Sequence, residues 1–201
     1  MSSVAPLHQP RAVAGIRATR RLYPDVPQVA CFDTAFHATL TPAASTYALP
    51  LRWREQWKLQ RFGFHALSHE YASRRAAELT GRTGDRGLRV VTCHLGAGAS
   101  LCATRGGRSV DTTMGFTPLE GLVMATRSGT VDPGLITWLV QYGGIEVGEL
   151  ARVLESESGL AGLSGIADGD MRDVLAARVG GDQVAHVAFD VYIHRLRREL
   201  G

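Results

Sequence analysis

The chain has 201 residues, of which 45% are hydrophobic and 20% charged, so it can bury a sizeable core and lacks the composition of a disordered protein. Its formal net charge of +3 is weakly basic, but the arginines are scattered, and we expect solvated helix faces rather than a nucleic-acid surface. Lys58 is the one lysine and no Gly-Lys-Ser/Thr sequence occurs, which excludes the phosphate loop of the commonest nucleotide-binding proteins.

Cysteine usage and hydropathy indicate the compartment. Cys31, Cys93 and Cys102 are odd in number and form no Cys-x-x-Cys pair, which favours reduced thiols over a disulfide framework or a zinc site. The first residues lack the basic and apolar regions of a signal peptide, and no apolar run approaches the ~18 residues that span a bilayer. We therefore expect a cytoplasmic protein that does not enter a membrane.

The N-terminal third is expected to contain helices and one short strand. Residues 10–23 predict a helix with Pro in its first turn, and the apolar run 27–32 predicts a buried strand. Asp33 follows that run, where a carboxylate would face a ligand crevice or form a turn. Residues 40–60 are expected to be irregular, and Ser68 is expected to cap a helix that reaches Thr80.

The middle of the chain predicts an antiparallel meander. Its three strands cover residues 88–94, 99–104 and 108–113, and a diglycine turn joins the last two. Residues 117–120 then read Thr-Pro-Leu-Glu, which has the pattern of a capping box with Pro at the first helical position. A helix is therefore expected to begin directly after the meander.

The C-terminal third predicts helices. One helix is expected to begin after Asp132, and residues 146–157 and 182–201 predict two further amphipathic helices. Residues 159–169 are expected to form a glycine-rich loop, with Asp170 as the N-cap of the helix behind it. Strands followed by helices place the chain in the mixed α and β class.

The turn after the first predicted strand is a candidate ligand site. Residues 94–100 read His-Leu-Gly-Ala-Gly-Ala-Ser, and the two glycines let the backbone approach a ligand and turn its N–H groups inward. Ser100 would add a hydroxyl donor, and a phosphate would suit such a concavity. A plain tight turn is the alternative.

Two further candidates carry an imidazole and a guanidinium group. His65 and His69 have the spacing of metal ligands on one helix face, but no Glu follows His65, so a zinc protease is not supported. An uncharged His65 as hydrogen-bond donor, or a satisfied core histidine, is favoured over a metal site. Arg127 lies in a Ser/Gly-rich connection, where it would clamp a carboxylate or phosphate or face a helix dipole.

Taken together, several segments resemble the acetate kinase family, which comprises acetate and propionate kinases. The segments occur in the family's order, span nearly the whole chain, and include a highly specific run over residues 109–134. The matching segments are residues 5–8, 29–37, 63–69, 93–100, 109–121, 126–129, 132–134 and 170–172.

The resemblance implies a mixed α/β fold of the actin, Hsp70 and sugar-kinase type (ribonuclease H-like), present in part. Residues 1–36 would be a remnant of an N-terminal kinase domain, and residues 37–201 would be the first part of a second domain. The implied activity is a phosphotransferase that moves a phosphoryl group reversibly between ATP and acetate or another short-chain carboxylate such as propionate. Its products are ADP and acetyl phosphate. Mg²⁺ as cofactor and pairing as a homodimer are also implied.

The same resemblance implies roles for residues at matched positions. His65 and Arg127 would stabilise the transferring phosphoryl group, and Asp33 would orient the reactants or a magnesium-bound water. The residues that would contact the nucleotide are His94, Leu95, Gly96, Ala97, Gly98, Asp170, Met171 and Arg172. The residues that would line the substrate pocket are Leu7, His8, Phe64 and Pro118.

The sequence also departs from the family pattern. Family members are about twice as long, and we expect this chain to be a central fragment that contains none of the family's metal ligands. Ala97 stands where the family has Asn. The alternatives to an active kinase are therefore a truncated, catalytically inactive remnant, or a non-catalytic nucleotide-binding or interaction module.

Overall fold

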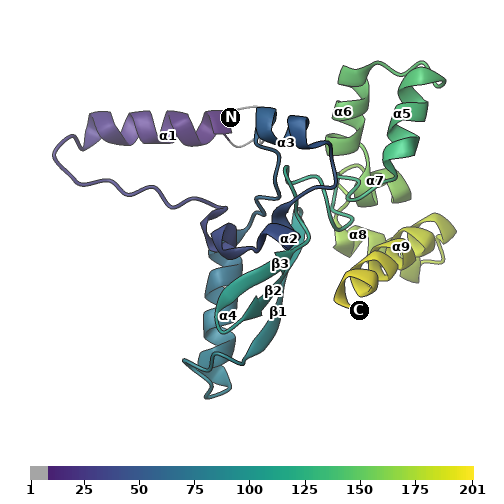
Figure 1. The fold of residues 1–201 in the computed structure, drawn as a ribbon. Coiled ribbons are helices and arrows are strands. Elements are labelled where there is room, and N and C mark those ends of the chain that lie inside the picture. Colours follow the sequence, from purple (N-terminus) through teal and green to yellow (C-terminus); the bar gives the residue numbers. More distant parts are fainter. Residues whose placement is uncertain (1–8) are drawn as a thin grey trace.

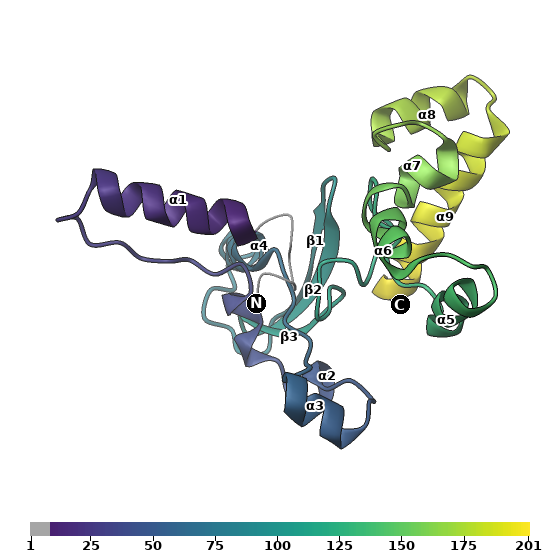
Figure 2. The ribbon, with the colours of Figure 1, turned by 90° about the horizontal axis from the view of Figure 1, so that it is seen from above.

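The computed structural model describes residues 9–201, so the expectations for Leu7 and His8 lie outside the described residues. The elements in chain order are α1 (Gln9–Leu22), η1 (Ala35–Thr39), α2 (Pro42–Ser45), α3 (Leu51–Trp57), α4 (Ala66–Leu79), β1 (Arg89–Leu95), β2 (Ala99–Arg105), β3 (Arg108–Thr112), α5 (Pro133–Gln141), α6 (Val147–Ser156), α7 (Gly159–Ser164), α8 (Met171–Val179) and α9 (Gln183–Leu200). Figure 1 shows α4 beside the sheet, and Figure 2 shows α1 and the helices α5 to α9 on opposite sides of it.

The sheet is the predicted antiparallel meander, in the order β1-β2-β3. β1 and β2 pair without interruption from Arg89 opposite Arg105 to Leu95 opposite Ala99. The pairing of β2 with β3 shifts register between Ala103 and Thr104. This register turns the alternate side chains of β1 and β2 to one face, and α4 packs against that face.

The described residues contain two small clusters of buried apolar side chains. The first contains Ala99, Leu101, Met114, Leu122 and Met124, with Phe64 and Leu196 packed against it. The second contains Val123, Leu160, Val174, Ala185 and Ala188. The successive residues Leu122, Val123 and Met124 therefore alternate between the two clusters, as an extended segment does. This segment joins the sheet to the helices behind it.

Several helices agree with the sequence predictions because their caps are local. Asp132, Asp170 and Asp182 each accept a hydrogen bond from a backbone N–H in the first turn of the helix that follows. The helices that they begin are α5, α8 and α9, and α1 and α6 also lie where they were expected.

The strand predicted at residues 27–32 is wrong. These residues are extended but form no ladder, and Val29 and Phe32 are 86% and 69% exposed. A strand exists only where another strand accepts its backbone hydrogen bonds, and none of the described strands lies beside this segment. Asp33 therefore follows an exposed extended segment and not a buried strand.

The helix predicted to begin at residues 117–120 is also wrong. These residues form turns, and the Glu120 carboxylate accepts hydrogen bonds from Tyr47 and Arg61 instead of a backbone N–H at a helix start. Arg61 at the same time donates to three successive backbone carbonyls of residues 112–114. A partner distant in the sequence has replaced the local capping box.

Three smaller differences concern loops and caps. The region expected to be irregular, residues 40–60, contains the short helices α2 and α3, and the expected loop 159–169 contains α7. α4 begins three residues before the expected position, with His65 instead of Ser68 at its N-cap. Ser68 uses its hydroxyl on the ring of His94 instead.

The chain exposes a large surface for its mass. Its accessible area is 13166 Å², whereas a compact folded protein of this mass exposes about 9,200 Å². Exposed apolar side chains contribute to the difference, among them Val91 and Leu95 on β1. Within residues 9–201, no helix has both the length and the apolar character needed to cross a bilayer.

Candidate active site

His65 stands at the start of α4 in an unusual backbone conformation. Its φ of 57° lies in the left-handed region, which non-glycine residues seldom adopt. The Asp33 carboxylate accepts a hydrogen bond from the His65 backbone N–H at 2.9 Å, and the Asp33 carbonyl accepts one from Ala66 at 3.1 Å. Asp33 thus fixes the first turn of α4 and the direction in which the imidazole leaves it.

The turn between β1 and β2 closes next to this imidazole. The Gly96 N–H donates to the Gly98 carbonyl at 3.1 Å, which makes the turn compact. The ring of His94 stacks on the ring of His65, with centroids 4.0 Å apart and planes 14° from parallel. The Ala97 carbonyl accepts from the Ala125 N–H at 3.0 Å and so ties the turn to the loop that carries Arg127.

Arg127 lies in that loop and is partly buried. Its guanidinium donates to the Pro118 carbonyl at 2.9 Å and contacts the sulfur of Met124. Burial lowers the pKa of Arg127, and the nearby charge of Glu155 acts in the opposite direction. Because the ordinary pKa of arginine is above 12, the side chain remains a cation at neutral pH.

These groups meet at Gly98. A Cβ atom placed on Gly98 would lie 3.5 Å from Nε2 of His65 and 3.6 Å from a terminal nitrogen of Arg127. The structure therefore brings the turn, the imidazole and the guanidinium of the sequence prediction to one small space. A cation, an imidazole and a backbone turn around one space form a site suited to an anion.

Buried histidines support the site from behind. His69 lies in α4 and bonds Thr92 and Ser100 through its two ring nitrogens, at 2.7 Å each. Burial, together with the charges of His37, His65 and His94, lowers the pKa of His69 to about 3, so it is neutral at physiological pH. The expectation that Ser100 offers its hydroxyl to a phosphate is not supported, because the residue is buried and bonds two imidazoles.

The other predicted site residues lie around this centre. Phe64 packs against the first apolar cluster, and Pro118 is held by its carbonyl to Arg127. Asp170 caps α8 and pairs with the exposed Arg172, which lowers the pKa of Asp170 to about 2. A Cβ on the preceding Gly169 would come within 2.1 Å of the Ala125 carbonyl oxygen. The backbone at Gly169 therefore packs directly against the loop that carries Arg127.

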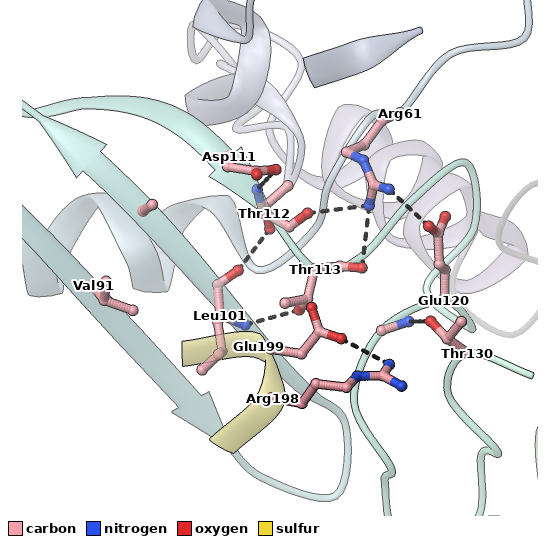
Figure 3. Close-up of a pocket in the computed structure, with 12 residues that line it drawn as sticks. Arg61, Val91, Leu101, Asp111, Thr112, Thr113, Glu120, Thr130, Arg198 and Glu199 are labelled. Carbon is pink, nitrogen blue, oxygen red and sulfur yellow. Dashed lines mark hydrogen bonds and ion pairs between the residues drawn. The ribbon is translucent and has the colours of Figure 1, made fainter. Parts of the chain in front are cut away.

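A separate pocket lies between the outer face of the sheet and the end of α9 (Figure 3). It is lined by Val91 and Leu101 and by the Arg61–Glu120 ion pair, and it includes none of the residues at Gly98. Sequence reasoning missed Arg61 and Tyr47 and interpreted Glu120 as a helix-capping residue. No motif links them, because 59 residues separate Arg61 from Glu120.

The comparisons with known proteins agree with this geometry. The sequence model described as the Acetokinase family matches residues 1–201. The chain belongs to the acetokinase family. An acetate kinase of Synechococcus sp. is 54% identical over 198 residues, which cover 98% of this chain and 48% of the relative. An acetate kinase of Bacillus cytotoxicus is 46% identical over 201 residues, 100% of this chain and 50% of the relative.

Solved structures of the family have the same fold. The acetate kinase of Porphyromonas gingivalis has a TM-score of 0.91 at 38% identity and is matched over 98% of this chain and 49% of its own. A propionate kinase of Francisella tularensis has a TM-score of 0.92 at 38% identity, over 99% of this chain and 50% of its own. The expected mixed α/β kinase fold, present in part, is confirmed. The chain spans about half the length of the curated relatives it matches.

The described residues do not form a complete magnesium site. Within residues 9–201, no group of three or more His, Cys, Asp or Glu side chains is arranged to hold a metal ion. The Asp33 carboxylate already accepts a hydrogen bond from the His65 backbone N–H. Mg²⁺ prefers a near-octahedral shell of oxygens, which this set of residues does not supply.

Proposed function

We propose that this chain carries the phosphoryl-transfer centre of an acetate kinase-type phosphotransferase. The reaction is reversible transfer between ATP and acetate, or a related short-chain carboxylate such as propionate, giving ADP and acetyl phosphate. One observation carries the proposal: Gly98, His65 and Arg127 surround a single space. Membership of the acetokinase family supports it independently.

The residues fit the demands of phosphoryl transfer. The reaction needs positioning and stabilisation of negative charge on the equatorial oxygens, and little covalent chemistry from the protein. Arg127 supplies a fixed cation, His65 a hydrogen bond, and residues 96–98 a backbone turn against the phosphates. Asp33 sets the direction of the imidazole, and His94 stacks on it.

The remaining assignments follow from the same proposal. The nucleotide lies along residues 94–98 and 170–172. The first segment contacts the loop around Ala125 through the Ala97 carbonyl, and Gly169, which precedes the second segment, lies against the Ala125 carbonyl. Phe64 and Pro118, with Leu7 and His8, form the wall that meets the short acyl group. Mg²⁺ arrives with the nucleotide, since phosphate oxygens are its usual ligands.

The proposal extends to organisation and location. Residues 1–36 belong to one kinase domain and residues 37–201 begin a second, with the nucleotide between the two domains. The exposed segment 23–32 and the contact of η1 with β3 support a boundary near residue 36. The uncovered apolar surface supports assembly as a homodimer, and the free thiols of Cys31, Cys93 and Cys102 support a cytoplasmic location.

A second candidate is a catalytically silent nucleotide-binding module. The excess surface and the exposed apolar side chains of β1 favour it, because the whole enzyme would cover them. Both candidates predict that the chain binds ATP, but only the kinase predicts that it forms acetyl phosphate.

A hydroxamate assay for acetyl phosphate, run on the purified chain with ATP, Mg²⁺ and acetate, separates them. The kinase proposal predicts turnover that is lost in Arg127→Ala. Binding of ATP by calorimetry without any turnover supports the silent module instead. Absence of both binding and turnover rejects both candidates.

A further inference from the structure

A chain of buried hydrogen bonds connects His65 to the interior of the protein. The Ser100 hydroxyl oxygen lies 2.9 Å from Nδ1 of His65 and 2.7 Å from Nε2 of His69. Ser100 is 0% exposed and His69 1% exposed, so no water competes for these contacts. A serine hydroxyl has one proton, so it can donate to no more than one of the two rings, and the other ring must then donate to it.

The hydrogen bonds of Thr92 determine which atom donates and which accepts in this series of hydrogen bonds. The Thr92 hydroxyl oxygen lies 2.7 Å from Nδ1 of His69 and 3.3 Å from the Cys102 carbonyl oxygen. A carbonyl only accepts, so the Thr92 hydroxyl donates to Cys102 and accepts from Nδ1–H of His69. Neutral His69 then has its lone pair on Nε2, where it accepts from the Ser100 hydroxyl. Ser100 in turn accepts from Nδ1–H of His65.

We propose that Thr92, His69 and Ser100 act as positioning residues that place a proton on Nδ1 of His65. Nε2 of His65, which faces Gly98, can then donate a hydrogen bond only when the ring carries a second proton and a positive charge. The inference rests on the proposed function for its consequence: the phosphoryl group is met by an imidazolium beside Arg127. This differs from the uncharged donor that sequence reasoning favoured.

The surroundings of His65 set the pH at which this happens. The Asp33 carboxylate accepts from the His65 backbone N–H, the ring of His94 stacks on the imidazole, and the Arg127 guanidinium lies across Gly98 from it. His69 faces it through Ser100 and is neutral. An anion bound at Gly98 favours the cationic ring, so binding takes up a proton. Above the pKa of His65, affinity for a phosphate should fall about tenfold per pH unit, which is the linkage for one proton.

His37 provides an internal reference. Its Nε2 lies 3.0 Å from the Phe64 carbonyl and must donate, so its Nδ1 accepts from the Ser109 hydroxyl. His37 is therefore the Nε2–H tautomer, whereas His65 and His69 are Nδ1–H tautomers when neutral. Long-range ¹H–¹⁵N correlation spectra of the ¹⁵N-histidine chain at pH 8 distinguish the two forms directly.

The expected spectrum shows Nδ1–H for His65 and His69 and Nε2–H for His37. An Nε2–H signal for neutral His65 overturns the inference. Thr92→Val removes the acceptor at His69, so we expect both His69 and His65 to change to Nε2–H, while Thr92→Ser keeps the parent pattern. An unchanged His65 in folded Thr92→Val also overturns it. If Thr92→Val does not fold, the spectrum of the unaltered chain decides alone.

Calorimetric titration with inorganic phosphate tests the consequence separately. The expected affinity falls about tenfold per pH unit above the pKa of His65 in the unaltered chain, and much less steeply in Thr92→Val. Phosphate binding with a neutral Nε2–H ring rejects the inference and leaves the proposed function intact. Nδ1–H tautomers in a chain that binds no phosphate reject the proposed function and leave the tautomer assignment intact.

Discussion

The region around α4 and the sheet is held by polar contacts, whereas the region of α7 to α9 is held by apolar ones. In the first, His69 and Ser73 of α4 bond the side chains of Thr92 and Thr104. In the second, Val174 and Ala188 are completely buried in an apolar cluster. Hydrogen bonds fix direction and respond to pH, whereas apolar packing does neither. The candidate site lies between the two regions. α4 and the sheet contribute His65 and Gly98, and the loop that carries Arg127 adjoins the apolar cluster.

The largest effect is expected for Arg127→Ala. It removes the fixed cation at Gly98, and an arginine of this kind contributes about 10³-fold or more to the rate of phosphoryl transfer. We expect acetyl phosphate formation to fall by that order, with partial recovery in Arg127→Lys. Arg82→Ala is the matched control, because Arg82 pairs with Asp85 at the surface and touches none of the site residues. Equal activity in Arg127→Ala and Arg82→Ala would contradict the assignment.

Gly98→Ala sharpens the comparison by filling the space without disturbing the fold. The added methyl group makes ordinary contacts of 3.5 to 3.6 Å with His65 and Arg127, and Gly98 does not have a positive φ. We expect phosphate affinity to fall roughly 10- to 200-fold, as for a misplaced methylene group in a binding site, with an unchanged Tm. Gly15→Ala, on exposed α1, is the control for both measurements. A stable Gly98→Ala variant with full affinity would show that no ligand occupies this space.

Val174→Ala tests the apolar region. Val174 is fully buried, so the loss of its two methyl groups should cost about 2 kcal/mol of unfolding free energy. Tyr192 is titratable and packs against this cluster, but burial raises its pKa further above neutral, so it stays uncharged and the loss should be the same at pH 7.5 and pH 5.5 in urea denaturation. Val179→Ala, at an 87% exposed position, should change little. If the loss of unfolding free energy in Val174→Ala depended on pH, the α7–α9 region would not differ from the α4–sheet region in its response to pH.

Acidification tests the polar region. The pKa of His69 falls from its ordinary 6.5 to about 3 in the folded chain, and burial also lowers the pKa of His37. Below pH 6.5, His69 binds a proton in the unfolded chain but stays neutral in the folded chain. The contribution of His69 to stability is therefore complete above pH 6.5 and is lost as the pH falls toward 3. At pH 5.5 we expect His69 alone to lower the unfolding free energy by about 1 kcal/mol.

His69→Gln removes this titration and provides the comparison. Its unfolding free energy should fall less steeply between pH 7 and pH 5 than that of the unaltered chain. Parallel curves for the two proteins would mean that His69 is not held neutral in the folded state.

The sequence predicted those parts of the fold whose causes are local. The meander follows from alternating residues around a diglycine turn, and Asp132, Asp170 and Asp182 each cap the helix behind them. The errors have distant causes. Residues 27–32 have strand chemistry but no described strand beside them, and residues 117–120 have a capping box whose Glu120 bonds Arg61 and Tyr47.

The site shows the same division. The glycines of the turn, His65 and Arg127 were recognisable by residue type and by resemblance to the family, and the structure brings them together. Their support was not recognisable. Ser100 lies between two imidazoles because β1 pairs with β2 opposite α4, which depends on strand register and helix packing at once. The periodicity of hydrophobic residues in a sequence cannot predict a contact that involves two strands and a helix together.

The central claim is that Gly98, His65 and Arg127 form one anion site, and a phosphate titration followed by NMR tests it most directly. The ring nitrogens of His65 and the side-chain Nε–H of Arg127 should shift together and saturate with one dissociation constant, while the exposed His194 should not move. Shifts at His65 and Arg127 that follow different dissociation constants, or no shift at either residue, would contradict the account.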